Sequence, residues 1–116
     1  KEIGFSLGTL SFEITSNLKL NASNTEVSLD AGEIKFPLLL RKRKTSDYFY
    51  PSGMNKKKKI SRFLIDLKLS APEKENVWVI ESNQRIIWVV GHRIDERVKV
   101  TDTTKMVLQL TLVPAK

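Results

Sequence analysis

The sequence predicts an α+β fold: a small, mainly antiparallel β-sheet or sandwich-like core with one main amphipathic helix. Two observations predict it. Short segments with alternating or β-branched apolar residues recur along most of the chain, as is typical of strands in antiparallel sheets. One segment, residues 57–69, instead has apolar residues at helical spacing. The 116 residues have the length of a single domain.

The first third of the chain alternates polar and apolar residues and is rich in Ser, Asn and Thr. This alternation predicts half-buried strands at Thr9–Ile14, Asn17–Leu20 and Glu26–Leu29. We interpret residues 1–35 as a linker or N-terminal strands, and residues 36–116 as the C-terminal domain proper.

The middle of the chain changes from a strand pattern to a helix pattern. Phe36–Arg43 begins apolar and ends charged, which predicts a strand, and Thr45–Asn55 contains Pro and Gly and predicts a loop. Lys57–Leu69 then predicts an amphipathic helix whose first turn is basic. Cations are unfavourable at a helix N-terminus unless an anion is near. The lysines there indicate either a phosphate partner or a solvated run at a frayed end, and the pattern alone leaves both open.

The second half of the chain predicts further strands around one hairpin. Pro72 is expected to end the helix, and Ala71–Asn76 to form a short turn. The expected strands are Val77–Ile80 and Ile86–Gly91, which form a buried hairpin, a short strand at Val98–Val100, and Met106–Val113, which closes the sheet.

Positive charge is concentrated in one block. The net charge is +7, yet residues 41–68 alone carry ten bases and two acids, a balance of +8. The remainder of the chain is therefore nearly neutral. A local block of this kind raises the concentration of polyanions near it, which favours a nucleic-acid partner.

No catalytic or metal-binding constellation is predicted. The chain has no Cys and a single histidine, His92, so disulfides and thiolate sites are excluded and His92 is expected to be structural. Asp95 and Glu96 are expected to pair with Arg93 and Arg97. Gly-rich nucleotide loops are absent from the sequence. No apolar run is long enough to span a bilayer, so no membrane partner is expected, and the absence of Cys fits the cytoplasm.

A binding surface is predicted instead. Tyr48, Phe49 and Tyr50 lie between two basic clusters, and RNA-binding surfaces combine cations for phosphates with planar side chains for bases. Phe49 is expected to fill the core, as are Trp78 and Trp88. The candidate RNA-binding residues are Arg41, Arg43, Tyr48, Tyr50, Lys56, Lys57, Lys58, Lys59 and Arg62.

Four ordered motifs carry a resemblance to a known family. They are PLLLRKR at 37–43, DYFYPSGM at 47–54, KKISRFLID at 58–66 and IWVVGHRIDER at 87–97. Together they resemble the C-terminal domain of tRNA(Ile)-lysidine synthetase, over about half of the chain. Ser46 stands where the family usually has Gly, and Arg62 where it usually has Asp.

The resemblance implies a division of labour within a longer parent protein. A C-terminal tRNA-binding domain, here residues 36–116, would hold the tRNA body and acceptor stem. An N-terminal catalytic domain would use ATP and Mg²⁺ to adenylate an anticodon cytidine, which lysine then attacks, so this fragment alone would have no catalytic site and no cofactor. The family is related in fold to a domain of the phenylalanyl-tRNA synthetase β chain. The expected partners are tRNA and the parent's catalytic domain, and a homodimer with a second copy is left open.

One alternative function stays open. The chain could be a structural or dimerisation module that packs on the catalytic domain, and an exposed apolar patch on the sheet would favour that reading.

Overall fold

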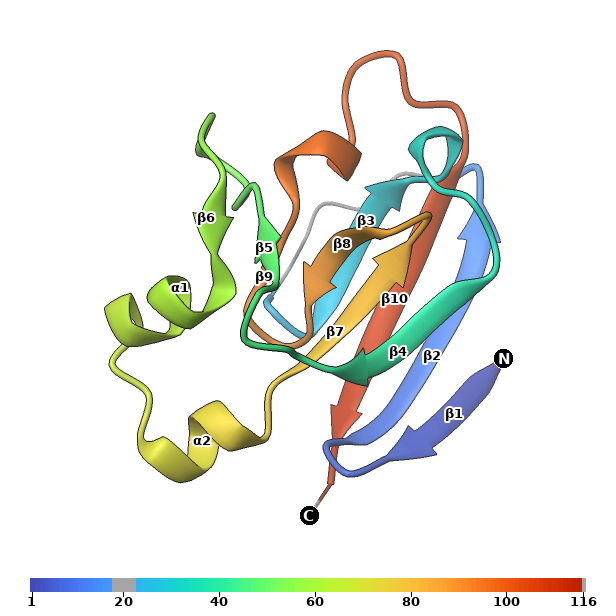
Figure 1. The fold of residues 1–116 in the computed structure, drawn as a ribbon. Coiled ribbons are helices and arrows are strands. Elements are labelled where there is room, and N and C mark those ends of the chain that lie inside the picture. Colours follow the sequence, from blue (N-terminus) through green and yellow to red (C-terminus); the bar gives the residue numbers. More distant parts are fainter. Residues whose placement is uncertain (18–22, 116) are drawn as a thin grey trace.

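The computed structural model describes residues 1–17 and 23–115. Within them, two four-stranded antiparallel sheets and a two-stranded ribbon form the β-structure (Figure 1). The first sheet has the order β1-β2-β10-β3, in which β10 lies between two strands from the start of the chain. Its strands are β1 (Glu2–Phe5), β2 (Gly8–Thr15), β3 (Glu26–Asp30) and β10 (Val107–Pro114).

The second sheet is built on the predicted hairpin. Its strands, in the order β4-β7-β8-β9, are β4 (Leu38–Lys42), β7 (Trp78–Ser82), β8 (Arg85–Val89) and β9 (Arg93–Ile94). Asn83 and Gln84 connect β7 to β8 with φ of 50° and 67°, the left-handed pair that a two-residue hairpin turn of type I′ requires.

The two sheets pack face to face around the larger core. Leu29, Leu108 and Leu110 of the first sheet meet Ile80 and Trp88 of the second, and all five are buried. The prediction that Trp88 lies in the core is confirmed. Trp78 is only partly buried, and it packs edge-to-face on Phe5 with ring centroids 5.2 Å apart.

A third layer covers the outer face of the second sheet. It consists of helix α1 (Ile60–Asp66) and the ribbon of β5 (Tyr48–Phe49) with β6 (Lys58–Lys59). Phe49, fully buried as predicted, meets Phe63 edge-to-face at 5.1 Å. The second sheet is therefore buried on both faces, which explains why β7 and β8 read as continuous apolar runs.

The predicted helix is shorter than its pattern suggested. It begins at Ile60 rather than Lys57, because Lys58 and Lys59 pair with β5 in an extended conformation. The expectation of lysines in a first helical turn is therefore wrong. The helix also ends before Pro72: Lys68 has a φ of 60°, and Pro72 lies in the first turn of α2 (Ala71–Glu75), which Ser70 caps.

Other local expectations have mixed outcomes. The strands expected at 9–14, 26–29 and 106–113 are confirmed as β2, β3 and β10. The strand expected at 98–100 is wrong, because the 3₁₀ helix η2 (Glu96–Val98) occupies part of it; another, η1 (Ala31–Glu33), follows β3.

The α+β class with a sandwich-like core is confirmed. The predicted strand at 17–20 falls on residues 18–22, which lie outside the described part of the chain. Strands from both sides of the predicted 35/36 division belong to one sheet, since β10 pairs with β2 and β3. Among the described residues, no helix is long and apolar enough to cross a membrane.

Candidate nucleic-acid interface

The β5–β6 ribbon turns two tyrosines away from the core. Successive residues of an extended strand point to opposite faces, so burial of Phe49 directs Tyr48 and Tyr50 outward. Lys59 is the cross-strand partner of Tyr48. We call Tyr48, Tyr50, Lys56, Lys57 and Lys59 the Tyr–Lys face.

Cations lie over both tyrosine rings. The Nζ atom of Lys57 is 4.5 Å from the centroid of Tyr48, and the guanidinium carbon of Arg97 is 4.4 Å from the centroid of Tyr50. Such contacts contribute about 0.5–1 kcal/mol at exposed sites. These contacts hold positive charge beside the flat tyrosine rings. Proteins that bind single-stranded nucleic acid combine cations and aromatic rings in this way.

The buried carboxylate of Asp95 holds Arg97 and Tyr50, the residue that follows β5, together. Asp95 is 1% exposed, and its carboxylate accepts hydrogen bonds from the backbone N–H of Tyr50 at 3.0 Å and of Arg97 at 2.8 Å. It also accepts from Nε and Nη2 of Arg97, at 3.0 and 2.9 Å. The predicted pairing of Asp95 with Arg97 is confirmed. Glu96 pairs with Lys99 instead, and Arg93 lies over the ring of Phe63.

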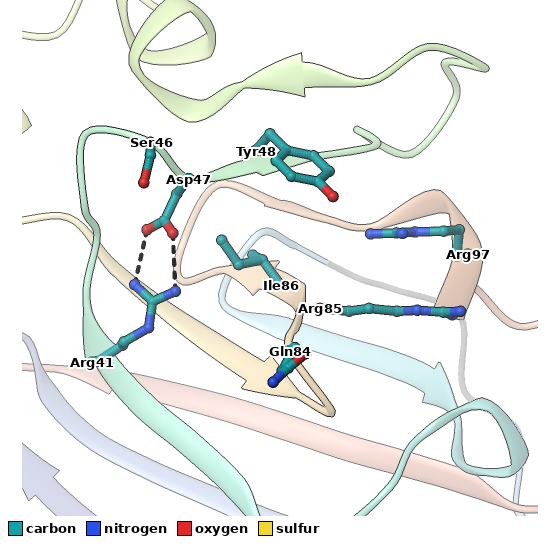
Figure 2. Close-up of a pocket in the computed structure, with 8 residues that line it drawn as sticks. All are labelled: Arg41, Ser46, Asp47, Tyr48, Gln84, Arg85, Ile86 and Arg97. Atoms are coloured by element: carbon teal, nitrogen blue, oxygen red, sulfur yellow. Dashed lines mark hydrogen bonds and ion pairs between the residues drawn. The ribbon is translucent and has the colours of Figure 1, made fainter.

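Arg41, a candidate RNA-binding residue, makes internal ion pairs. Its Nη1 and Nη2 donate to the two carboxylate oxygens of Asp47 at 2.8 and 3.0 Å (Figure 2), and its Nε donates to Glu81 at 3.0 Å. Burial alone would raise the pKa of Asp47, but hydrogen bonds from Arg41 and from the backbone N–H of Lys44 hold that pKa below its ordinary value. Arg41 thus ties β4 to residues 44–50, the segment with Tyr48 and Tyr50 that we call the tyrosine loop.

Three other candidates also have protein partners. The Nε of Arg43 donates to the carbonyl oxygen of Lys74 at 3.2 Å. Lys58 forms an ion pair with Asp66. Arg62 lies 3.9 Å from the same carboxylate, but its side chain is 74% exposed and so remains accessible.

The remaining basic candidates are three exposed lysines. Lys56, Lys57 and Lys59 are exposed, and none of them forms an ion pair within residues 1–17 and 23–115. The structure thus separates the predicted cations into those held by other groups of the protein, such as Arg41, Arg43 and Lys58, and those open to a polyanion. How each contributes to RNA binding stays a prediction.

Three residues that the sequence reasoning did not select lie next to the Tyr–Lys face. Gln84, Arg85 and Arg97 line a pocket together with Arg41 and Tyr48 (Figure 2). Arg97 ends one of the quoted motifs, but the pattern did not show that it meets Tyr50. Gln84 belongs to the hairpin turn and Arg85 begins β8 directly after it, positions where polar residues are ordinary.

His92 is half-buried, and the charge that influences it is that of Glu73. Burial lowers its pKa, opposed by the charge of Glu73. In the described part of the chain, no three His, Cys, Asp or Glu residues are grouped as a metal site would need.

The fold and this surface define a small three-layer α+β domain with a basic, tyrosine-bearing face. Its residues 38–110 match the family model described as the TilS substrate C-terminal domain. The chain belongs to that family.

Similar full-length proteins carry one name. The chain is 40% identical over 102 residues to the tRNA(Ile)-lysidine synthase of Parabacteroides distasonis, covering 85% of this chain and 23% of that protein. It is 36% identical over 96 residues to the enzyme of the same name from Bacteroides thetaiotaomicron, covering 83% and 22%. The chain thus spans less than a quarter of these relatives.

A solved structure shows the same fold. The crystal structure of a TilS C-terminal domain matches with a TM-score of 0.80 over 93% of this chain and 85% of that chain, at 20% sequence identity. At this identity the likeness establishes the arrangement of the helices and strands. It does not establish the role of individual side chains.

Proposed function

We propose that the Tyr–Lys face binds the backbone of a tRNA. The observation that carries the proposal is the Tyr–Lys face itself, in and beside the β5–β6 ribbon. It presents two tyrosines and three lysines in the most basic part of the chain, and these lysines have no ion-pair partner among residues 1–17 and 23–115. Phosphate contacts dominate the affinity of such surfaces. The relatives named tRNA(Ile)-lysidine synthase supply the class of RNA.

The proposal places this chain in a longer parent enzyme. The rest of that protein would carry the lysidine-forming chemistry, with ATP and Mg²⁺ as its cofactors, in the cytoplasm. The domain would raise the residence time of tRNA on the enzyme through contacts remote from the reaction, since duplex RNA is recognised mainly by shape and backbone.

A salt titration of tRNA binding tests the face. Each phosphate contact adds about 0.7–0.9 to the magnitude of the slope of log affinity against log salt. Replacing Lys56, Lys57 and Lys59 together with Ala is therefore expected to lower that slope by about 2. A thermal melt should hardly change, because exposed lysines contribute little to stability.

A matched variant controls for net charge. Lys35, Lys74 and Lys105 lie outside the face, and their replacement with Ala removes the same charge. It should leave most of the slope in place. If both triple variants lower the slope equally, the protein attracts tRNA only through its overall charge and the Tyr–Lys face is not a binding site.

A groove favours the second candidate function, docking of this domain on the rest of its parent chain. The groove, of about 580 Å³, opens between β1, β2 and β4 and is lined largely by apolar side chains. Ile3, Phe36 and Leu39 are each about half exposed there. Exposed apolar surface of this kind marks interfaces, and more than three quarters of each named relative lies outside the matched region.

The docking function has its own test. In the full-length parent, Leu39→Lys should release the domain, which limited proteolysis would report as faster cleavage between domains. Val113→Lys, at an exposed apolar residue that does not line the groove, is the control. Equal cleavage of the wild type and both variants would exclude the groove as a docking site.

A further inference from the structure

A pocket of about 230 Å³ lies between the tyrosine loop and the β7–β8 hairpin (Figure 2). Its lining residues come from three separate stretches of sequence. They are Arg41, Ser46, Asp47, Tyr48, Gln84, Arg85, Ile86 and Arg97. Since one molecule of liquid water occupies about 30 Å³, the pocket has room for roughly seven or eight waters, more than one phosphate group needs.

One wall of the pocket is held rigid. Arg97 donates twice to buried Asp95 and stacks on Tyr50. A guanidinium fixed along one edge keeps its other N–H groups pointing outward in a constant plane. Arg97 is therefore ready to meet a planar or anionic group without losing conformational freedom on binding.

The acid in the pocket is neutralised. Both oxygens of Asp47 accept hydrogen bonds from Arg41, and the backbone N–H of Lys44 adds a third. Burial raises the pKa of Asp47, but these donors together hold it below its ordinary value. The carboxylate thus has little repulsion left for an incoming anion.

Arg85 contributes the unpaired charge. It is exposed at the start of β8, and no ion pair to it exists among the described residues. In Figure 2 its side chain extends beside that of Arg97, across from Tyr48. The guanidinium groups of Arg85 and Arg97, the Tyr48 ring and the Gln84 amide therefore line the pocket together with the apolar side chain of Ile86.

This lining is rich in donors and in flat surfaces. Phosphate oxygens and the carbonyl edges of nucleobases are acceptors that arginine reads with paired N–H groups. Bases removed from a helix stack on tyrosine rings and guanidinium planes. Bases inside a duplex cannot enter a pocket of this kind, since they are stacked and paired.

We propose that this pocket takes one unpaired nucleotide of an RNA, next to the duplex backbone held by the Tyr–Lys face. The proposal rests on the proposed tRNA-binding function and deepens it. A tRNA offers unpaired nucleotides at its 3′ end and in its loops, so the pocket adds a contact that blunt duplex RNA lacks.

Two RNAs that share one duplex test the proposal. One is blunt, and the other carries a short single-stranded 3′ extension. Stacking and arginine contacts with one base are worth about a tenfold gain in affinity, so the wild type should bind the extended RNA about tenfold more tightly. Arg85→Gln should remove that difference and leave the affinity for the blunt duplex within about twofold.

Arg62→Gln is the matched control. Arg62 is an exposed arginine that does not line the pocket. Its replacement should weaken both RNAs alike and keep the ratio between them. A thermal melt of each variant shows whether the fold is kept.

A measurement on the wild type alone complements the variants. Adding a single-stranded tetranucleotide should shift the NMR signals of the Ile86 methyl groups and the Arg97 Nε–H group. Inorganic phosphate at the same ionic strength should not reproduce those shifts, because it fills only part of the pocket.

The outcomes separate the two proposals. Equal binding of both RNAs by the wild type, or full competition by inorganic phosphate, would overturn the nucleotide pocket while the tRNA-binding face stands. Failure of the wild type to bind either RNA would refute the face and the pocket together. Loss of the extension's advantage in Arg85→Gln but not in Arg62→Gln supports the pocket.

Discussion

Asp95→Asn is expected to destabilise the domain strongly, because one buried carboxylate accepts four hydrogen bonds. Two come from backbone N–H groups of Tyr50 and Arg97, and two from the Arg97 guanidinium. An amide has a single acceptor oxygen, and its NH₂ group would face donors. Hydrogen bonds to charged groups are worth about 1.5–3 kcal/mol each.

The expected loss is about 3 kcal/mol, less than the sum of the lost bonds. The Arg97 side chain is 30% exposed, so water can solvate it once the carboxylate is gone. For a domain of this length, the unfolding entropy is about 0.24 kcal/mol per degree, so the melting temperature should fall by about 12 °C. Calorimetry of the wild type and the variant measures this directly.

Asp102→Asn is the control, because Asp102 is an exposed acid in the loop before β10 and loses the same charge. It should change the free energy of unfolding by no more than about 0.5 kcal/mol. If the melting temperature falls by less than about 4 °C for Asp95→Asn, or equally for both variants, the four hydrogen bonds do not stabilise the contact of Asp95 with Tyr50 and Arg97.

Further predictions concern the core and pH. Trp88→Ala should lower the free energy of unfolding by about 3–5 kcal/mol, measured by denaturant unfolding. Trp88→Phe should lower it clearly less, since the indole Nε1 has no acceptor among the described residues. Equal losses for the two variants would contradict this. Asp47 has a lowered pKa, so its stabilisation is complete above the unfolded value near 4 and is lost as pH falls through the folded value. Asp47→Asn should therefore be less stable at pH 7 and show a shallower loss on acidification below about pH 4, and parallel acid curves for the two proteins would refute the linkage. His92 also has a lowered pKa. Acidification below its unfolded pKa of about 6.5 should therefore destabilise the wild type, because protons bind the unfolded chain more readily. His92→Asn should lose less stability between about pH 6.5 and 5, and identical curves of stability against pH for the two proteins would exclude the effect.

The central hairpin could be predicted because its burial determines its local composition. Strands β7 and β8 are covered on both faces, so their residues are apolar without alternation, and the turn between them is polar. The predicted start of the helix, Lys57, lies before its actual start at Ile60 for a non-local reason. Lys58 and Lys59 continue a helical spacing in sequence, yet pairing with Tyr48 and Phe49 holds them extended.

The binding face was harder to predict than the fold. Charge density selects the stretch of chain that carries the Tyr–Lys face, but Arg41 and Lys58 look as available in sequence as Lys57 does. Only the folded chain brings Asp47 and Glu81 to Arg41, and Asp66 to Lys58. Arg85 has no sequence signal, because a cation next to a hairpin turn is common on any protein surface.

The position of β10 has a consequence for synthesis of the protein. Strands β2 and β3 leave the ribosome early, but neither can complete its hydrogen bonds until residues 107–114 arrive and insert between them. Until then, the inner faces of both strands are open to solvent and to other nascent chains. The first sheet should therefore close late and slowly, as non-local pairing does, and a message truncated before β10 should yield an insoluble product rather than a smaller domain.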